Sequence, residues 1–483
     1  MKLREPLPKL RGAVFLNAAR AIFLCAAFPA GAEVTYPYEL PSELSATIEV
    51  NTKVKTPFNN LLLGLNCNWP EGQYGLQGYN NPVAQNLIRT FKPSSLRWPH
   101  GVWANVYDWE VDGRRMYDDY KTEYRSGVEK HPELRYGFPG LHSLHQELKF
   151  DVLFVWNINY DSPEKGVRRL LDRRAKGFDM KWIELGNETF WKNQRSNAVS
   201  DVQKYIEVTK AHAAALKAVA PDVKLSVNVT WREASNGTWN QPLMAEHYFD
   251  AVTLHKYVTP GETPDGIKEA LNARKLILDT AETIRRDFPR RPIWLSEWAV
   301  DCGNNAISIV GMTDIYLGIF ARPDLFEIAD YFQLNAAEAL VRYDKATGIH
   351  TKTSYGAAYE IVRDVFENSE RYESRVKSTA IAEGLDAVNA EAVIKDGKVI
   401  VFAVNKANRS VPFSVKLDGA PCTQPLKHRA FAFENVNAFP SFGLEESALT
   451  DVTPKSGGLV LPPLSINRIE GLSIATTPIE TSR

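Results

Sequence analysis

The sequence predicts an α/β fold: a (β/α)₈ TIM barrel that carries an accessory antiparallel β-sandwich domain. Three observations predict it. Eight short apolar runs end in polar residues, amphipathic stretches of helical period separate them, and short strands with turn signals replace this alternation after about residue 376. A doubly wound open sheet is the rival fold, but no Gly-rich phosphate turn follows any of the runs, which end in Asn, Glu, His and Trp.

The barrel strands are expected in the eight apolar runs, because short apolar segments between amphipathic helices are typical of buried parallel strands. Helices are expected between them, as in 162–176 and 200–220, where apolar residues recur every three or four positions. A last helix is expected over 354–368. The eight runs are 61–69, 94–101, 151–159, 180–188, 222–230, 249–257, 291–299 and 328–336.

The regions that flank the barrel have the pattern of antiparallel strands. Residues 44–55 alternate apolar and polar side chains, as a half-buried strand does, and we expect this strand to join the C-terminal sandwich. Lys395-Asp396-Gly397 is a hairpin signal within that sandwich. The expected divisions are an N-terminal segment at 33–55, the catalytic barrel at 56–368 and the β-sandwich at 369–483.

The first 32 residues have the pattern of a signal peptide. Basic residues precede an apolar stretch at 21–28, and Ala30-Gly31-Ala32 is a small-residue cleavage pattern. The stretch is short for a membrane span. We therefore expect a secreted or periplasmic protein with no membrane span after cleavage of the signal.

Composition excludes several classes of partner and cofactor. The net charge is -1, and no basic run indicates nucleic acid or an anionic membrane surface as a partner. Cys67, Cys302 and Cys422 remain after the leader, so at most one disulfide can form among them. No zinc motif, P-loop or nucleophile elbow is present, and His142 and His145 lack the zinc-protease spacing, so they are expected on a solvated helix face. We expect no metal and no cofactor; the oligomeric state stays open.

Two carboxylates are the strongest catalytic candidates. Glu188 ends the fourth predicted strand and Glu297 ends the seventh, and side chains at the C-terminal ends of barrel strands meet at one mouth. Hydrolysis of a glycosidic bond uses such a pair, one as general acid/base and one as nucleophile, about 5–5.5 Å apart in retaining enzymes. Glu184, which shares strand parity with Glu188, is a weaker competitor for the acid role.

Other strand ends supply the expected substrate-binding residues. Arg97 would hold Glu297 ionised, unless it forms only a structural salt bridge. Asn187 would form a hydrogen bond to a sugar hydroxyl, and the hydroxyl group of Tyr257 would tune the charge of the nucleophile. The remaining candidates would form a polar, aromatic-walled pocket that suits carbohydrate. They are Asn68, Trp156, His255, Trp298 and Gln333.

These motifs resemble clan A glycoside hydrolases, and within them the α-L-arabinofuranosidases of family 51, over nearly the whole mature chain. Gly186-Asn187-Glu188 with Phe190-Trp191 resembles the acid/base segment, and Ser296-Glu297-Trp298 resembles the nucleophile segment. Further motifs resemble the strand ends and the closing sandwich strand of that family. They are Leu96-Arg97-Trp98-Pro99, Tyr107-Asp108-Trp109, His255-Lys256-Tyr257, Gln333-Leu334-Asn335 and Leu461-Pro462-Pro463-Leu464-Ser465.

The resemblance implies a retaining glycoside hydrolase that acts on a poly- or oligosaccharide. Two departures from the family lie at the expected sugar site: His100-Gly101-Val102 replaces its Gly-Gly-Asn, and Asn68 replaces its strand-one Glu. We therefore expect weak action on arabinofuranosides, with family 39-like enzymes on pyranosides as neighbours. Two alternatives share these residues: a catalytically silent carbohydrate-binding protein and a transglycosylase.

Overall fold

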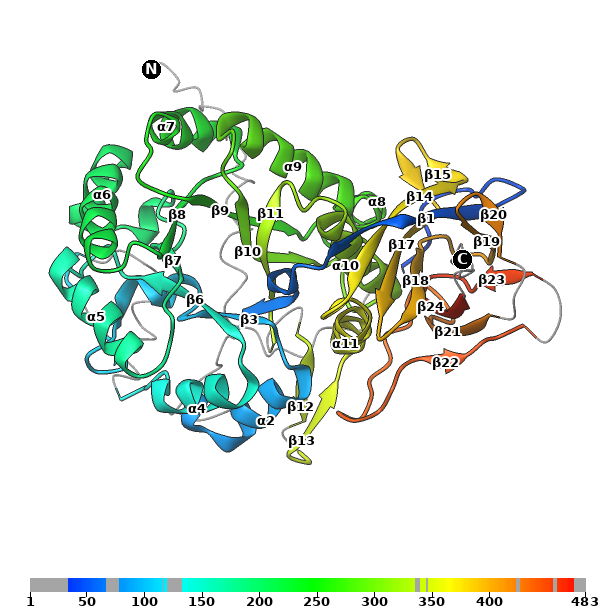
Figure 1. Cartoon of the computed structure of the whole chain (residues 1–483), viewed down its shortest axis with the longest axis horizontal. Helices are drawn as coiled ribbons and strands as arrows, with labels where there is room; N and C mark the ends of the chain where they lie inside the picture. The colour runs from blue at the N-terminus through cyan, green and yellow to red at the C-terminus, as the bar shows by residue number, and fades with distance from the viewer. Residues whose placement is uncertain are drawn as a thin grey trace, which may run out of the picture. The chain divides into compact units, whose positions relative to one another are not determined.

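Eight parallel strands close into a barrel in the computed structural model, and they follow one another around it in chain order (Figure 1). Each of the eight expected runs overlaps one of these strands. The model describes residues 34–66, 78–115, 117–119, 133–334, 339–344, 346–422, 426–454 and 458–472. The barrel strands are β2 (Gly64–Asn66), β3 (Ser95–Trp98), β6 (Asp151–Trp156), β7 (Trp182–Leu185), β8 (Lys224–Asn228), β9 (Ala251–Val258), β10 (Ile293–Val300) and β11 (Phe326–Phe332).

Helices connect the barrel strands, and their first residues show why they start where they do. Ser162 caps one helix by accepting a hydrogen bond from the Lys165 backbone, with Pro163 in its first turn, and Asp201 caps the next in the same way. The helices are α2 (Pro82–Phe91), α4 (Phe138–Leu148), α5 (Pro163–Ala175), α6 (Val202–Val219), α7 (Glu233–Met244), α8 (Pro264–Leu271), α9 (Ala273–Asp287), α10 (Ala306–Phe320) and α11 (Ser354–Phe366).

The second part of the fold is a ten-stranded sheet in the order β20-β19-β1-β14-β17-β18-β24-β21-β22, with β23 on β19. The strand expected near the N-terminus, β1 (Ala46–Pro57), pairs antiparallel with β14 and parallel with β19. The other strands are β14 (Glu370–Ser378), β17 (Val388–Lys395), β18 (Lys398–Asn405), β19 (Val411–Leu417), β20 (Ala420–Pro421), β21 (Lys427–Ala432), β22 (Thr450–Asp451), β23 (Leu459–Leu461) and β24 (Ser465–Leu472).

The predicted hairpin joins β17 to β18. Asp396 and Gly397 both have positive φ, +50° and +72°, as a two-residue hairpin turn requires, and Lys395 pairs with Lys398 across it. Three two-stranded ribbons complete the described strands. They are β4 (Tyr107–Asp108) with β5 (Gly113–Arg114), β12 (Val341–Asp344) with β13 (Ile349–Lys352), and β15 (Ala380–Ala382) with β16 (Leu385–Asp386).

Helix α10 lies between the barrel and the sheet. Its sequence is apolar on all sides and every one of its residues is buried, as expected for a helix that packs on both faces. It contacts β10 of the barrel and β17, β18 and β24 of the sheet (Figure 1). Asp314 in its middle accepts a hydrogen bond from Lys406 Nζ at 2.9 Å, and both side chains are buried. The barrel is thereby joined to the sheet by packing and by an ion pair.

The barrel interior changes from apolar to polar along its axis. At the N-terminal ends of the strands, five buried side chains with Leu61 against them fill the interior as an apolar layer. Above them the inward-facing side chains are polar and hydrogen-bonded, for example Ser226 to Thr253 at 2.6 Å. A catalytic site can therefore form only at the C-terminal mouth. The apolar layer consists of Leu153, Trp182, Ala251, Trp294 and Ile328.

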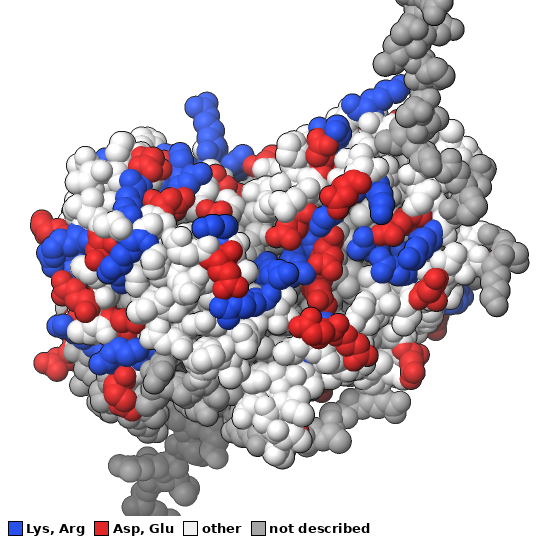
Figure 2. All heavy atoms as spheres, turned by 60° about the horizontal axis from the view of Figure 1, so that its bottom comes forward, with Lys and Arg blue, Asp and Glu red and all other residues white. Residues whose placement is uncertain are grey.

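The surface carries no region of one sign on the face that Figure 2 shows, where acidic and basic side chains are interspersed. This agrees with the net charge of -1. Within the described residues, no helix is both long and apolar enough to cross a membrane. Residues 1–32, where we expect the signal peptide, lie outside the described part of the chain.

Candidate active site

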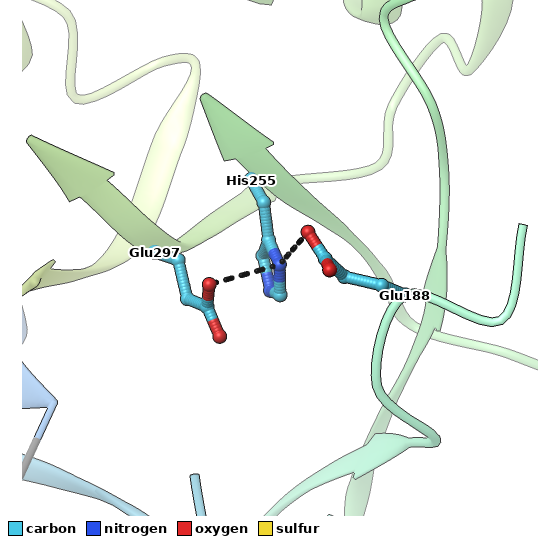
Figure 3. Close-up of side chains that lie close together, drawn as sticks. All are labelled: Glu188, His255 and Glu297. Atoms are coloured by element: carbon cyan, nitrogen blue, oxygen red, sulfur yellow. Dashed lines mark hydrogen bonds and ion pairs between the residues drawn. The ribbon is translucent and has the colours of Figure 1, made fainter. Parts of the chain in front are cut away.

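Glu188 and Glu297 meet at the mouth of the barrel, with His255 between them (Figure 3). A carboxylate oxygen of each glutamate and a ring nitrogen of His255 all lie within 4.8 Å of one another. Glu297 and His255 are register partners on β10 and β9, whereas Glu188 stands in the loop after β7. The structure thus brings the two predicted carboxylates together at a separation suited to a covalent glycosyl intermediate.

The backbone at Glu188 adopts a conformation that few side chains favour. Its φ is +45°, in the left-handed region, and it follows Gly186 with φ of +88°. This turn lifts the side chain of Glu188 over the mouth, where it is 21% exposed. A non-glycine residue in this region carries strain, and such strain is common at functional sites.

Arg97 binds two carboxylates at once. Its Nε and Nη2 each donate to an oxygen of Glu184 at 2.8 Å, and its Nη1 donates to Glu297 Oε1 at 2.5 Å. Arg97 and Glu184 are wholly buried, and Glu297 nearly so. Arg97 therefore forms buried ion pairs with both Glu184 and Glu297. Glu184 is wholly buried and bonded to Arg97 and Ser296, whereas Glu188 is partly exposed, so Glu188 is the better placed of the two to reach a substrate.

Tyr257 and His255 complete the surroundings of Glu297. The Tyr257 hydroxyl donates to Glu297 Oε2 at 2.6 Å, while His255 Nδ1 lies 3.4 Å from the same oxygen and 3.1 Å from Glu188 Oε1. Nε2 of His255 lies 3.0 Å from Ser296 Oγ. Both oxygens of Glu297 thus face a donor, which fixes the orientation of the carboxylate at the mouth.

The proton in this cluster resides on His255. Burial lowers the pKa of His255, but the charge of Glu297 and hydrogen bonds to Glu184 and Glu188 raise it to about 9. Burial raises the pKa of Glu188, but hydrogen bonds from His255 and Gln194 bring it below its ordinary value. The hydrogen bonds to Glu188 therefore outweigh the effect of its burial.

Asn187 is held within the protein. Its Oδ1 accepts from Arg97 Nη2 at 2.8 Å, and its Nδ2 donates to Gln194 Oε1 at 2.8 Å. Gln194 in turn donates to Glu188 Oε2 at 2.7 Å, and Asn105 bonds both Gln194 and the backbone of Asn187. Asn187 therefore links the arginine to the general-acid candidate, in addition to any contact with a sugar.

The aromatic walls expected at the site are buried elsewhere. Trp156 packs under Arg169 of α5, whose Cζ lies 4.2 Å from the ring centroid, and Trp298 packs on Tyr316 of α10 at 4.6 Å. Both are wholly buried. Alternate residues of a strand face opposite sides, and these two face the helices. Their assignment to the sugar pocket is wrong. Trp98 and Trp103, which stand near the end of the second barrel strand, are buried as well.

Three further expectations concern residues at or beyond the edge of this cluster. Gln333 is buried, and its side-chain oxygen has no hydrogen-bond partner among the described residues. Asn68 lies outside the described residues. His100, one of the departures from the family pattern, is buried next to Arg97, and burial lowers its pKa to about 3, so it stays neutral.

Four residues that contact the site were not among the predicted site residues: Asn66, Asn105, Gln194 and Ser296. Asn66 donates to the Ser296 carbonyl and accepts from Arg97. Gln194 and Asn105 bind the segment that carries Glu188. Asn66 and Ser296 lie near strand ends, so position was an available signal. Gln194 lies in a short 3₁₀ turn (Lys192–Gln194) and Asn105 in another (Gly101–Val106), where periodicity carries no signal.

Glu188, His255 and Glu297 are the one metal-capable cluster found among the described residues. A metal-bound imidazole must be neutral, whereas the pKa of His255 is raised to about 9, which favours the positively charged imidazolium form. The Arg97 guanidinium also occupies one oxygen of Glu297. The donor set therefore fits an acid–base pair better than a metal ion. His142 and His145 lie outside the cluster and pack against Phe178, so their helix face is only partly solvated.

Searches with family models and with curated proteins found no match to this chain. Solved structures do match. A family 51 arabinofuranosidase from Xanthomonas axonopodis pv. citri has a TM-score of 0.69 at 16% identity, over 89% of this chain and 100% of that one. The α-L-arabinofuranosidase from Thermotoga maritima gives 0.67 at 15%, over 89% and 100%. A family 44 xyloglucanase from Paenibacillus polymyxa gives 0.60 at 12%, over 88% and 99%. The chain therefore has the barrel-and-sandwich fold of these clan A glycoside hydrolases, as its sequence motifs suggested.

Proposed function

We propose that this protein is a retaining glycoside hydrolase, with Glu297 as nucleophile and Glu188 as general acid/base. The observation that carries the proposal is the pair itself: carboxylate oxygens within 4.8 Å at the barrel mouth. In retaining enzymes the carboxyl groups are about 5–5.5 Å apart, whereas inverting enzymes keep a water between groups about 6.5–9.5 Å apart. The structurally similar proteins include an arabinofuranosidase and a xyloglucanase, which supports a carbohydrate as the substrate.

In the first step Glu297 attacks the anomeric carbon while the leaving oxygen takes a proton from Glu188. The donors Arg97 and Tyr257 bind the two oxygens of Glu297 and hold its carboxylate in position. Glu188 receives its proton from His255 Nδ1, 3.1 Å away. The largest influence that raises the pKa of His255 is the charge of Glu297, and that charge disappears when the ester bond forms. The proton then moves towards Glu188 as it is needed.

In the second step Glu188, now ionised, takes a proton from water, and the water attacks the anomeric carbon and releases Glu297. The restored charge on Glu297 raises the pKa of His255 again, so the imidazole regains the proton from Glu188. Each double displacement therefore returns the cluster to its starting state, with configuration at the anomeric carbon retained.

Rescue by azide tests both assignments. Glu188→Ala should lose hydrolysis of substrates with poor leaving groups and regain turnover of activated aryl glycosides with azide, giving a glycosyl azide of retained configuration. Glu297→Gly with azide should give the inverted product. Arg322→Met, a surface control distant from the mouth, should act as the wild type. An azide product of the same configuration from both catalytic variants would contradict the assignment.

Export follows from the proposal that the leader is a signal peptide. We propose that the mature chain begins after Ala32 and acts on polysaccharide outside the cytoplasm. N-terminal sequencing of protein recovered from periplasm or medium tests this, and an intact leader on that protein would contradict it.

A further inference from the structure

We propose that the barrel rim beside Glu188 binds an anionic group of the substrate, either the carboxylate of a uronic acid or a sulfate ester, through Lys256 and Arg232. This inference rests on the proposed function and adds to it the chemical class of the sugar on the leaving-group side.

Two cations gather on one exposed tryptophan at this rim. Lys256 Nζ lies 3.6 Å from the centroid of the Trp231 ring, and Arg232 Cζ lies 5.3 Å from the same ring and 4.7 Å from that of Trp191. Trp231 is 38% exposed. An aromatic face with fixed cations beside it suits a charged sugar, because the ring takes the apolar face of a sugar and the cations take its anion.

Within the described residues, neither the ammonium of Lys256 nor the guanidinium of Arg232 forms an ion pair. Burial and the positive charge of Arg232 lower the pKa of Lys256. The negative charge of the exposed Glu269, which lies beyond ion-pair distance, partly opposes this effect. Lys256 is only 8% exposed. A nearly buried cation next to another cation is costly without a counterion, and an anion bound here would offset that cost.

The position of the pair assigns it to the leaving group. Trp231 and Arg232 follow β8, which stands between β7 and β9 in the barrel. Lys256 directly follows His255 on β9, with its side chain on the opposite side of the strand, and reaches the rim through its contact with Trp231. The backbone of Trp191 donates to the Glu188 carbonyl at 2.8 Å. Glu297 and Arg97 stand on β10 and β3, outside this arc. The general acid contacts the leaving oxygen, so a group beyond Glu188 on this side meets the leaving sugar.

A matched lysine–tryptophan pair occurs at the other end of the barrel. Lys181 Nζ lies 4.4 Å from the ring centroid of Trp182, at the N-terminal end of β7. It shares the cation–π contact but lies at the opposite end from the mouth. Lys181→Met therefore controls for the loss of one such contact and one charge.

The test compares one polymer with and without its charges. The wild type is assayed on glucuronoxylan, pectic and sulfated algal polysaccharides, and the best of them is then assayed after carboxyl reduction or after desulfation. We expect removal of the recognised charge to lower kcat/KM at least about tenfold, as for loss of a charge-assisted hydrogen bond. The arm that causes the loss identifies the anion. The ratio should fall to about one in Lys256→Met/Arg232→Met and persist in Lys181→Met.

Equal kcat/KM on the charged and neutral forms in the wild type would overturn the inference while leaving the proposed function intact. If no glycan is hydrolysed, the proposed function fails, and tryptophan fluorescence then judges the anion site by itself. In that titration, oligogalacturonate and a sulfated disaccharide are the probes. A saturable change in the wild type that the double variant lacks supports the site, and the absence of any saturable change overturns it.

Discussion

Replacing Arg97 by Met should abolish activity and also lower the free energy of unfolding. This loss of stability should be larger at neutral pH than at acidic pH. The substitution keeps the length of the side chain but leaves two carboxylates without their cation, Glu184 wholly buried and Glu297 nearly so. Removing one partner from a buried ion pair costs about 3–5 kcal/mol, because the remaining charge stays buried and uncompensated.

The titration of Glu184 gives an independent magnitude. Burial raises the pKa of Glu184, but the charge and hydrogen bonds of Arg97 lower it from 4.5 to about 2. At 1.36 kcal/mol per pH unit this difference corresponds to about 3 kcal/mol of stability at neutral pH. In the wild type that contribution is complete above pH 4.5 and is lost as the pH falls towards 2.

The assay is urea denaturation at pH 7 and at pH 4.5, followed by tryptophan fluorescence. In Arg97→Met the largest influence that lowers the pKa of Glu184 is gone, and only His255 still opposes the effect of burial. Protonation of Glu184 then relieves the buried charge, so the deficit relative to wild type should shrink at the lower pH. Arg322→Met removes an arginine from surface pairs with Asp324 and Glu282 and should cost at most about 1 kcal/mol. A loss under about 1 kcal/mol in Arg97→Met, or one equal at both pH values, would refute the reasoning.

Three further outcomes are expected. Tyr257→Phe removes the 2.6 Å hydrogen bond to Glu297 and should lower kcat about 10- to 100-fold with unchanged unfolding; unchanged kcat would contradict this role. His255→Gln should move the basic limb of kcat/KM from about pH 9 to lower pH, since the pKa of His255 is about 9 and Glu188 would then hold its proton unaided; pH profiles of both proteins decide it. Burial raises the pKa of Asp330 to about 8, so the folded state binds a proton that the unfolded state loses near pH 4, and wild-type stability should fall as the pH rises from 4 to 8. Asp330→Asn should lack this dependence when urea denaturation is measured across that range, and parallel slopes in the two proteins would refute the explanation.

The barrel could be predicted because its strands are short apolar runs with polar ends, and that pattern needs no tertiary information. The meeting of Glu188 and Glu297 could be predicted because both belong to the C-terminal parts of strand–loop segments that converge at the barrel mouth. The direction in which side chains point near a β-bulge could not be predicted from the sequence. The β9–β10 register shifts between Trp294 and Glu297, so counting residues along β10 does not say which of Glu297 and Trp298 faces the mouth.

The charge state of the site was also beyond the sequence. The hydrogen bonds that lower the pKa of Glu188 come from His255 on β9 and from Gln194 in a 3₁₀ turn. Likewise Trp231 and its two cations form a cluster only because β8 and β9 are neighbours in the barrel. Such contacts depend on how the strands are arranged in space, and no local sequence pattern predicts them.

The configuration of the first sugar released is the most direct test of the central claim. A substrate from the polysaccharide and aryl glycoside panel is hydrolysed by the wild type in an NMR tube, and the anomeric proton signals are followed before mutarotation. With Glu188 and Glu297 at 4.8 Å or less between their nearest oxygens, double displacement should release first the anomer that has the configuration of the substrate. Initial release of the opposite anomer would contradict a glycosyl-enzyme on Glu297.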